Sequence, residues 1–137
     1  MKIENKKENL KRLQKSILDE DATSLNKTLL SLFKDGVDKD FTPLLLILVD
    51  SKWHTFEEDI VNLLEEVADP RAVEKLYQVA IDIPDYDDMR ALAKKCIWAL
   101  RAINTKESIE KLTTLKNHND EIISENAAFM LQNLIKD

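Results

Sequence analysis

The chain has little of what β-sheets, disulfides and catalytic sites require. Its 137 residues include one glycine, one cysteine, two histidines and three prolines. Tight β-turns demand glycine, so we expect no sheet, and a single cysteine cannot form an internal disulfide. One glycine also excludes a glycine-rich phosphate loop, and two histidines far apart in the sequence offer no pair of base and nucleophile. The composition therefore predicts an all-α protein without enzymatic activity, with Cys96 in its core.

Long apolar runs are missing as well. No run approaches the roughly 18 apolar residues of a membrane-spanning helix, and the first residues are too charged for a secretory signal. At 137 residues, 44% of them hydrophobic, the chain has the size and apolar content of one domain, which we place at residues 1–137. We expect this domain in the cytoplasm, without a membrane partner.

Positive charge is scarce in the middle of the chain. Residues 37–88 contain four basic and fourteen acidic residues, a net charge of −10, whereas residues 1–36 and 89–137 each contain eight basic and six acidic residues. Such an acidic centre repels phosphate and attracts a basic surface, whose approach it accelerates at low salt. The charge pattern disfavours nucleic acid and predicts a protein partner with a basic surface.

The apolar residues recur at steps of three and four, which predicts helices with one buried face each. Cap and turn residues divide this pattern into eight helices, hence four antiparallel hairpins. The residues expected to cap, open or end these helices are Asp21 or Thr23, Gly36, Thr42 with Pro43, Thr55 with Glu58 as a capping box, Asp69 with Pro70, Asn104 with Thr105, and Asn119 or Asp120. The residues expected to face the core include Ile3, Leu10, Leu13, Ile17, Leu18, Leu25, Leu29, Leu30, Leu32, Phe33, Ile60, Val61, Leu64, Val67, Leu76, Met89, Leu92, Cys96, Leu100, Leu112, Ile123, Met130 and Leu134.

An internal repeat relates the last two pairs of helices. Residues 73–76 read Val-Glu-Lys-Leu and residues 109–112 read Ile-Glu-Lys-Leu, an offset of 36. The second helices align at an offset of 34, which places Ala93 over Ala127 and Leu100 over Leu134. Repeats of this length with two helices each are typical of α-solenoids.

Residues 69–103 also carry a family resemblance. They contain Asp69-Pro70 before the first helix, the pair Met89-Arg90, a small residue at Ala93 and the pair Cys96-Ile97. This pattern resembles a HEAT repeat, and the resemblance extends over residues 60–135, with Ser124 in place of the usual arginine in the final repeat. It implies a short right-handed α-solenoid of about four hairpins, whose second helices line a concave face. A chain of this size looks like a small stand-alone bacterial HEAT protein.

Trp98 is the first candidate for a binding residue. It lies on one helical stripe with Asp87, Lys94 and Arg101, opposite the residues expected in the core. On the concave face of a HEAT-like stack, an aromatic side chain between two cations would be a binding anchor. The alternative is that Trp98 packs on the second helix of the next repeat, near Phe129.

Two acidic segments supply the remaining candidates. Residues 85–88 begin like a calcium-binding loop but have Arg90 where glycine is needed and Cys96 where glutamate is needed, so we read them as a helix start rich in caps. The alternative is an acidic rim of Tyr86, Asp87 and Asp88 that meets basic groups. His54 and Glu58 are four residues apart, but two ligands do not make a metal site. We expect no metal or cofactor and assign both residues to the binding rim.

Three functions fit such a chain. The leading hypothesis is a non-catalytic module that holds a protein on its concave, centrally acidic face, as a monomer or as a heterodimer with that partner. Small acidic proteins of this kind resemble immunity proteins that neutralise a toxin. The second is a DNA glycosylase, because one family of these enzymes is built of HEAT-like repeats, but it needs a basic groove. The third is a lyase or chaperone for a bilin, since HEAT-like repeats occur in phycobilin lyases, although nothing marks a cofactor pocket.

Overall fold

The structure is a computed structural model that describes residues 1–136, and the side chains of residues 1–133. This part of the chain forms eight α-helices and two short 3-10 turns, without a strand. The elements are α1 (Ile3–Asp19), α2 (Ala22–Asp35), η1 (Lys39–Phe41), α3 (Thr42–Val49), α4 (Glu57–Val67), η2 (Pro70–Ala72), α5 (Val73–Ile81), α6 (Ala91–Ile103), α7 (Lys106–Lys116) and α8 (Glu121–Lys136). The predictions of an all-α fold and of eight helices are confirmed for residues 1–136.

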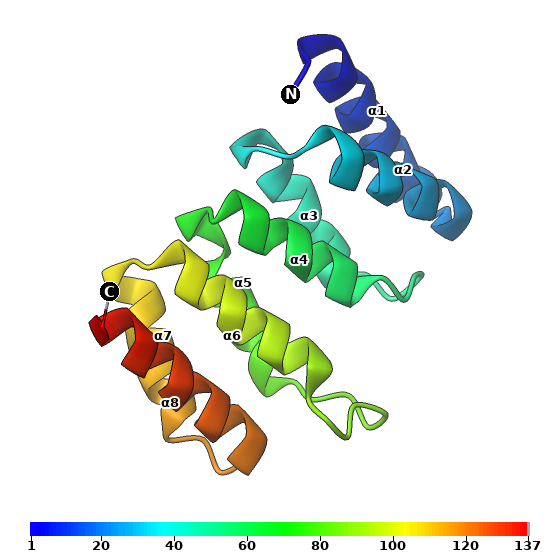
Figure 1. Ribbon diagram of the computed structural model, residues 1–137. Coiled ribbons are helices and arrows are strands. Elements are labelled where there is room, and N and C mark those ends of the chain that lie inside the picture. The colour runs from blue at the N-terminus through cyan, green and yellow to red at the C-terminus, as the bar shows by residue number, and fades with distance from the viewer. Residues whose placement is uncertain (137) are drawn as a thin grey trace.

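The helices form two layers. α4 packs against α6 and α6 against α8, while α1 contacts α3 and α5 contacts α7. Figure 1 shows α2, α4, α6 and α8 side by side on the near side of the molecule, with α1, α3, α5 and α7 behind them. We call these the even layer and the odd layer. The pairs follow one another from the N-terminal to the C-terminal end, and every even helix runs in the same direction.

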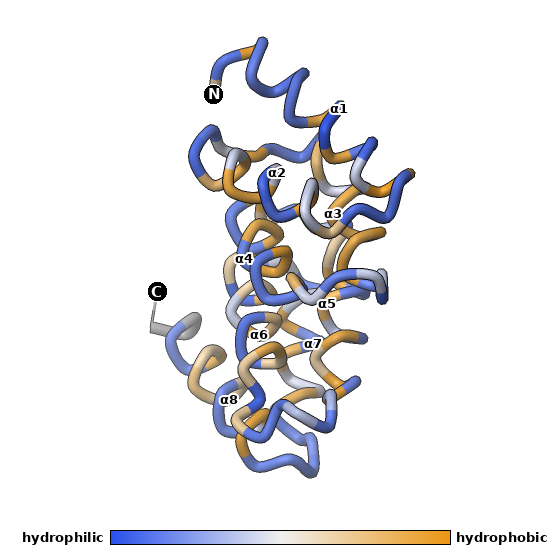
Figure 2. Tube along the Cα trace, turned by 90° about the vertical axis from the view of Figure 1, so that its right-hand side faces the viewer, coloured by the Kyte–Doolittle hydropathy of each residue, from blue (hydrophilic) through white to orange (hydrophobic). Residues whose placement is uncertain are grey.

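A single hydrophobic cluster fills the space between the layers, with members from every helix. Leu76, Leu100 and Leu112 are fully buried in it, as their spacing predicts. Cys96 is also fully buried, and burial raises the pKa of its thiol. Figure 2 shows hydrophobic positions recurring along the molecule, whereas α1 at the N-terminal end is largely hydrophilic.

The first pair of helices buries less than the sequence predicts. Leu18 is 83% exposed and Leu30 64% exposed, and Ile3 and Phe33 are also exposed. Polar groups take their place: Asn9 Nδ2 donates to Asp35 Oδ2 at 2.9 Å, and the hydroxyls of Ser16 and Ser24 lie 2.8 Å apart. The predicted inward positions of Ile3, Leu18, Leu30 and Phe33 are therefore wrong, because a terminal pair has a neighbour on only one side. Leu134 lies outside the described side chains.

Two predicted helix starts are wrong in detail. α4 begins at Glu57 after Phe56 and receives no side-chain cap, so the capping box of Thr55 and Glu58 does not form. Thr42 is the first residue of α3 rather than its cap. The caps at Asp21 and Thr105 are confirmed, since both side chains accept a backbone N–H in the first turn of the following helix. Gly36 ends α2 with φ of +96°, a conformation that side chains disfavour.

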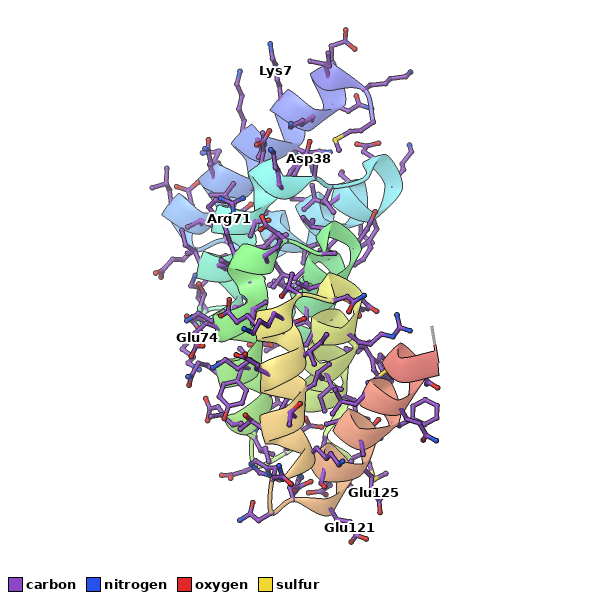
Figure 3. The ribbon with its side chains drawn as sticks, turned by 90° about the vertical axis from the view of Figure 1, so that its left-hand side faces the viewer. Lys7, Asp38, Arg71, Glu74, Glu121 and Glu125 are labelled. Carbon is purple, nitrogen blue, oxygen red and sulfur yellow. The ribbon has the colours of Figure 1, made fainter. Side chains whose placement is uncertain are left out.

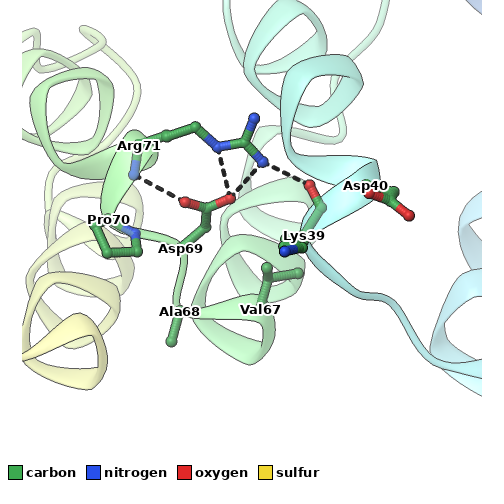
Figure 4. Close-up of a pocket in the computed structure, with 7 residues that line it drawn as sticks. All are labelled: Lys39, Asp40, Val67, Ala68, Asp69, Pro70 and Arg71. Atoms are coloured by element: carbon green, nitrogen blue, oxygen red, sulfur yellow. Dashed lines mark hydrogen bonds and ion pairs between the residues drawn. The ribbon is translucent and has the colours of Figure 1, made fainter.

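Charged contacts connect successive pairs along one edge of the molecule. Lys6 of α1 bonds Asp38, and Lys111 of α7 bonds Glu74 of α5. Figure 3 shows Asp38, Arg71 and Glu74 on this edge. Arg71 Nη2 donates to the Lys39 carbonyl at 2.8 Å and so joins η2 to η1. Figure 4 shows this contact beside an open hollow of about 560 Å³. Two carboxylates, Asp40 and Asp69, lie beside the two cations in this hollow, so it offers no clear preference for an ion of either sign.

Asp69 makes part of the stability dependent on pH. Its carboxylate is buried and accepts from the Arg71 guanidinium at 2.7 and 3.0 Å and from the Arg71 N–H at 2.9 Å. Bonding to Arg71 lowers the pKa of Asp69 from 3.8 to about 2, against the effect of burial. Because the pKa is lower in the folded state, this stabilisation is present above about pH 4 and is lost as the pH falls toward 2.

We expect Asp69→Asn to lower the free energy of unfolding by about 1–2 kcal/mol at pH 7, less than the pKa alone suggests because Arg71 is half exposed. The difference from the unmodified protein should shrink as the pH falls from 5 to 2.5. Denaturant titrations across this range measure it. A difference that stays constant over the range would contradict the assignment to the ionised carboxylate.

Candidate functional site

A smaller and more enclosed hollow lies at the edge opposite the charged links, between the α3–α4 loop and the α5–α6 loop. Its volume is about 250 Å³. It is lined by Val49, Asp50, Lys52, Glu57, Val79, Asp82, Pro84, Tyr86 and Leu92. We call it the acidic hollow, because three carboxylates and one lysine surround a floor of apolar side chains.

The floor and the rim differ in chemistry. Val49 and Leu92 are buried and form the apolar floor together with Val79 and Pro84. On the rim Asp50 bonds Lys75, while Glu57 and Asp82 make no ion pair within the described part of the chain. An apolar floor below unpaired carboxylates suits a lysine or arginine side chain. Its aliphatic part can lie on the apolar floor while its cationic end pairs with a carboxylate on the rim.

Tyr86 stands over this hollow with 76% of its surface exposed. Desolvation, and then the negative charges of Glu57, Asp87 and Glu58, raise the pKa of its phenol. The raised pKa reflects the approach of the α5–α6 loop to the first turn of α4. Tyr86 and Glu58, both predicted to bind the partner, are therefore brought together, and Asp88 is exposed on the same loop.

Asp87 shapes one wall of the hollow from inside. It is 8% exposed, and its carboxylate accepts the N–H of Ala91 at 2.8 Å and of Leu92 at 3.1 Å. Arg90 follows with φ of +57° and bonds Asp120 of the next pair at 2.8 Å. α6 consequently begins at Ala91, and Met89, predicted in the core, is 66% exposed. The helix-start interpretation of these residues is confirmed for Asp87, whose carboxylate is not available to a partner.

His54 shapes the other wall. It is 5% exposed, its Nδ1 accepts the N–H of Phe56 at 2.9 Å, and its Nε2 lies 2.7 Å from the Leu48 carbonyl. An Nδ1 that accepts a hydrogen bond carries no proton, so the proton of the neutral ring is on Nε2 and is donated to Leu48. Trp53 packs edge-on against this ring. The assignment of His54 to the binding rim is therefore wrong, because the ring is buried and its two nitrogens bond the backbone of Leu48 in the last turn of α3 and of Phe56 in the α3–α4 loop.

Trp98, Lys94 and Arg101 lie elsewhere, on the outer side of α6 in the even layer. Trp98 is 38% exposed and does not belong to the buried cluster, while Lys94 and Arg101 are half-buried. The predicted binding residues therefore form two groups, one at the acidic hollow and one on the even layer. Sequence reasoning missed Asp50, Glu57 and Asp82 as individual site residues, although the acidic excess of residues 37–88 pointed to their region.

Other kinds of site find no support in the described residues. Within the part of the chain that the structure describes, no group of three or more potential ligands could hold a metal ion, and no helix is long and apolar enough to cross a membrane. Searches of protein-family models, of curated proteins and of solved structures found no match to this chain.

We expect Trp98→Ala to lower the free energy of unfolding by less than about 1.5 kcal/mol, because over a third of the side chain is already in water. Ile97→Ala is the matched control, since Ile97 is fully buried in the same turn and its truncation should cost about 2–5 kcal/mol. Denaturant titration of both variants measures the costs. Equal losses for the two would mean that Trp98 packs between helices, as the alternative holds.

Proposed function

We propose that this protein is a non-catalytic binding module, a short right-handed HEAT-like solenoid in the cytoplasm that holds a basic segment of a partner protein. The observation that carries the proposal is the acidic hollow with the exposed Tyr86 above it. Tyrosine is enriched where proteins bind one another, because it combines a large apolar surface with a hydrogen-bonding group. The apolar floor and the unpaired Glu57 and Asp82 select a lysine or arginine side chain over an acidic one.

The two-layer arrangement supports the solenoid part of the proposal. Each pair of helices packs on the next, even helix on even helix and odd on odd, as in stacked repeats. The bond from Arg90 to Asp120 joins two successive loops, and it uses the arginine on which the resemblance to HEAT repeats partly rests. The final repeat has Ser124 at the matching position, whose hydroxyl donates to the Lys116 carbonyl at 2.5 Å within its own pair.

A toxin neutralised by this chain is the specific partner we propose. Enzymes that act on nucleic acid present basic surfaces to phosphate, and the acidic hollow complements such a surface. A gene for the toxin beside the gene for this chain would name the partner. The glycosylase alternative is disfavoured, since the same carboxylates repel DNA.

The test uses two peptides of one length, one alternating lysine and leucine and the other alternating glutamate and leucine. We expect the basic peptide alone to bind, with NMR shift changes confined to residues 50–57 and 82–89. Glu57→Gln with Asp82→Asn should weaken this binding at least about tenfold, the effect of removing two rim charges. Glu110→Gln on α7 is the control for a carboxylate on another face and should change nothing.

Two results would contradict the proposal. One is equal binding of both peptides, or binding that the rim variants do not weaken. The other is a complex with double-stranded DNA at physiological salt, which would favour the glycosylase alternative.

A further inference from the structure

The outer face of the even layer alternates in charge from helix to helix. α2 exposes Lys27 and Lys34, and its one acidic residue, Asp35, accepts a hydrogen bond from Asn9 of α1. α4 contains five acidic residues and no basic one. α6 contains three basic residues and no acidic one, and the described side chains of α8 include Glu121 and Glu125 but no cation. The order along the layer is therefore positive, negative, positive, negative.

Several of these charges have no oppositely charged partner among the described residues. In the portion of the chain that the structure describes, no ion pair involves an acidic residue of α4, Lys94 of α6, or Glu121 and Glu125 of α8. Between the polar sides of α4 and α6, Lys95 Nζ donates to Asn62 Oδ1 at 3.3 Å, a bond that leaves the charge of Lys95 without a carboxylate partner among the described residues. Figure 3 shows Glu121 and Glu125 on the outside of α8. Adjacent helices thus carry opposite charges, and several of these charges can still form ion pairs with a second molecule.

Large apolar side chains are exposed at the same face. Leu30 is 64% exposed and Phe33 44% on α2, Trp98 is 38% exposed on α6, and Phe129 is 56% exposed on α8. Single exposed apolar residues are common on monomers, but here they recur across one layer whose helices alternate in charge. Aromatic anchors with complementary charges are the composition of a protein interface.

The geometry points to a second copy of this chain as the occupant of this face: we propose a two-fold dimer in which α4 of one copy lies against α6 of the other, and α2 against α8. A two-fold axis parallel to the helices reverses the order of the layer and so places each positive helix on a negative one. It also places Leu30 and Phe33 of α2 opposite Phe129 of the second copy. A two-fold axis along the stack would instead set every helix on its own copy, like charge on like charge.

The dimer leaves the acidic hollow free, because the loops that line the hollow lie at the edge of the layers. It is therefore independent of the proposed binding function, and each can fail without the other. The variants below change Glu65 and Glu66 at the far end of α4 from the hollow, which preserves the residues of that site.

The experiment compares charge-reversed chains by sedimentation velocity at low salt. Chain one carries Glu65→Lys and Glu66→Lys on α4, and chain two carries Lys94→Glu and Lys95→Glu on α6. The unmodified chain should dimerise, and its dimer should dissociate as salt rises, because interface charges are screened. Each reversed chain alone should bind itself at least about tenfold more weakly, since like charges then meet twice across the two-fold axis.

Mixing the two reversed chains is the decisive step. Each then presents the charge that the other lacks, so the mixture should form a heterodimer with affinity close to that of the unmodified dimer. Trp98→Ala should weaken the unmodified dimer, and Glu110→Lys on α7 should leave it unchanged. Circular dichroism of each variant confirms that it is folded. A monomer at all concentrations in low salt, a dimer indifferent to the reversals, or a mixture that fails to associate would each overturn the proposal.

Discussion

Leu100→Ala should lower the free energy of unfolding by about 2–5 kcal/mol, the cost of removing a buried leucine side chain and leaving a cavity. Leu100 is fully buried in α6, which packs against α4, α5, α7 and α8. Because α6 is surrounded by four helices, the side chains around the cavity cannot easily move in to fill it. The loss of stability should therefore lie toward the upper end of that range. Chemical denaturation measures it as a lower midpoint with an unchanged slope.

Leu30→Ala is the matched control for Leu100. It makes the same chemical change on a helix of the same layer, at a side chain that is 64% exposed. The expected loss is below about 0.5 kcal/mol in the monomer, as for other surface substitutions. Losses of similar size at the two positions would mean that the buried and exposed faces of the even helices are not the ones described here.

His54→Phe should cost about 2–4 kcal/mol although it preserves an aromatic ring in the same place. The imidazole of His54 stacks on Phe56 and lies edge-on to Trp53, contacts that phenylalanine can keep. It cannot replace the bonds to the Phe56 N–H and the Leu48 carbonyl. Each buried backbone group left without a partner costs about 1–3 kcal/mol.

The chain offers its own control for His54. His118 makes the same local contact, accepting the N–H of Asp120 on its Nδ1 at 2.9 Å, but it is only half-buried. Water can replace the lost bond there, so His118→Phe should cost less than about 1 kcal/mol. Thermal or chemical denaturation of both variants gives the comparison. A loss for His54→Phe no larger than for His118→Phe would show that its two bonds contribute little.

The buried faces of the central helices could be predicted from the sequence because their buried positions recur at regular steps. Leu76, Leu100 and Leu112 each belong to an apolar stripe of helical spacing on their own helix, and neighbouring helices on both sides make every position of these stripes a core position. Leu18 and Leu30 follow the same spacing but lie on the terminal pair, where part of each stripe has no neighbour. Periodicity identifies a helical face, but it does not show whether another helix covers that face.

The acidic hollow was harder to predict for a different reason. Its carboxylates come from three separate segments, with Asp50 after α3, Glu57 at the start of α4 and Asp82 after α5. Only the folded loops bring them together. Those loops depend on contacts that no local rule indicates: His54 rather than Thr55 organises the start of α4, and Asp87 caps α6 from four residues upstream. The net charge of the region was readable from composition, but its shape was not.

The polar contact between α1 and α2 has a consequence for cooperativity. The pair of α5 and α6 has neighbouring helices on both sides along the stack. Its amide protons can therefore exchange with water only when much of the molecule unfolds. α1 packs chiefly on α2, through a face that mixes leucines with the polar Asn9 and Ser16, so its opening exposes less apolar surface than the opening of α5 and α6. We therefore expect the N-terminal helix to be a separate unit of low local stability, with amide protons that exchange while the other helices stay folded.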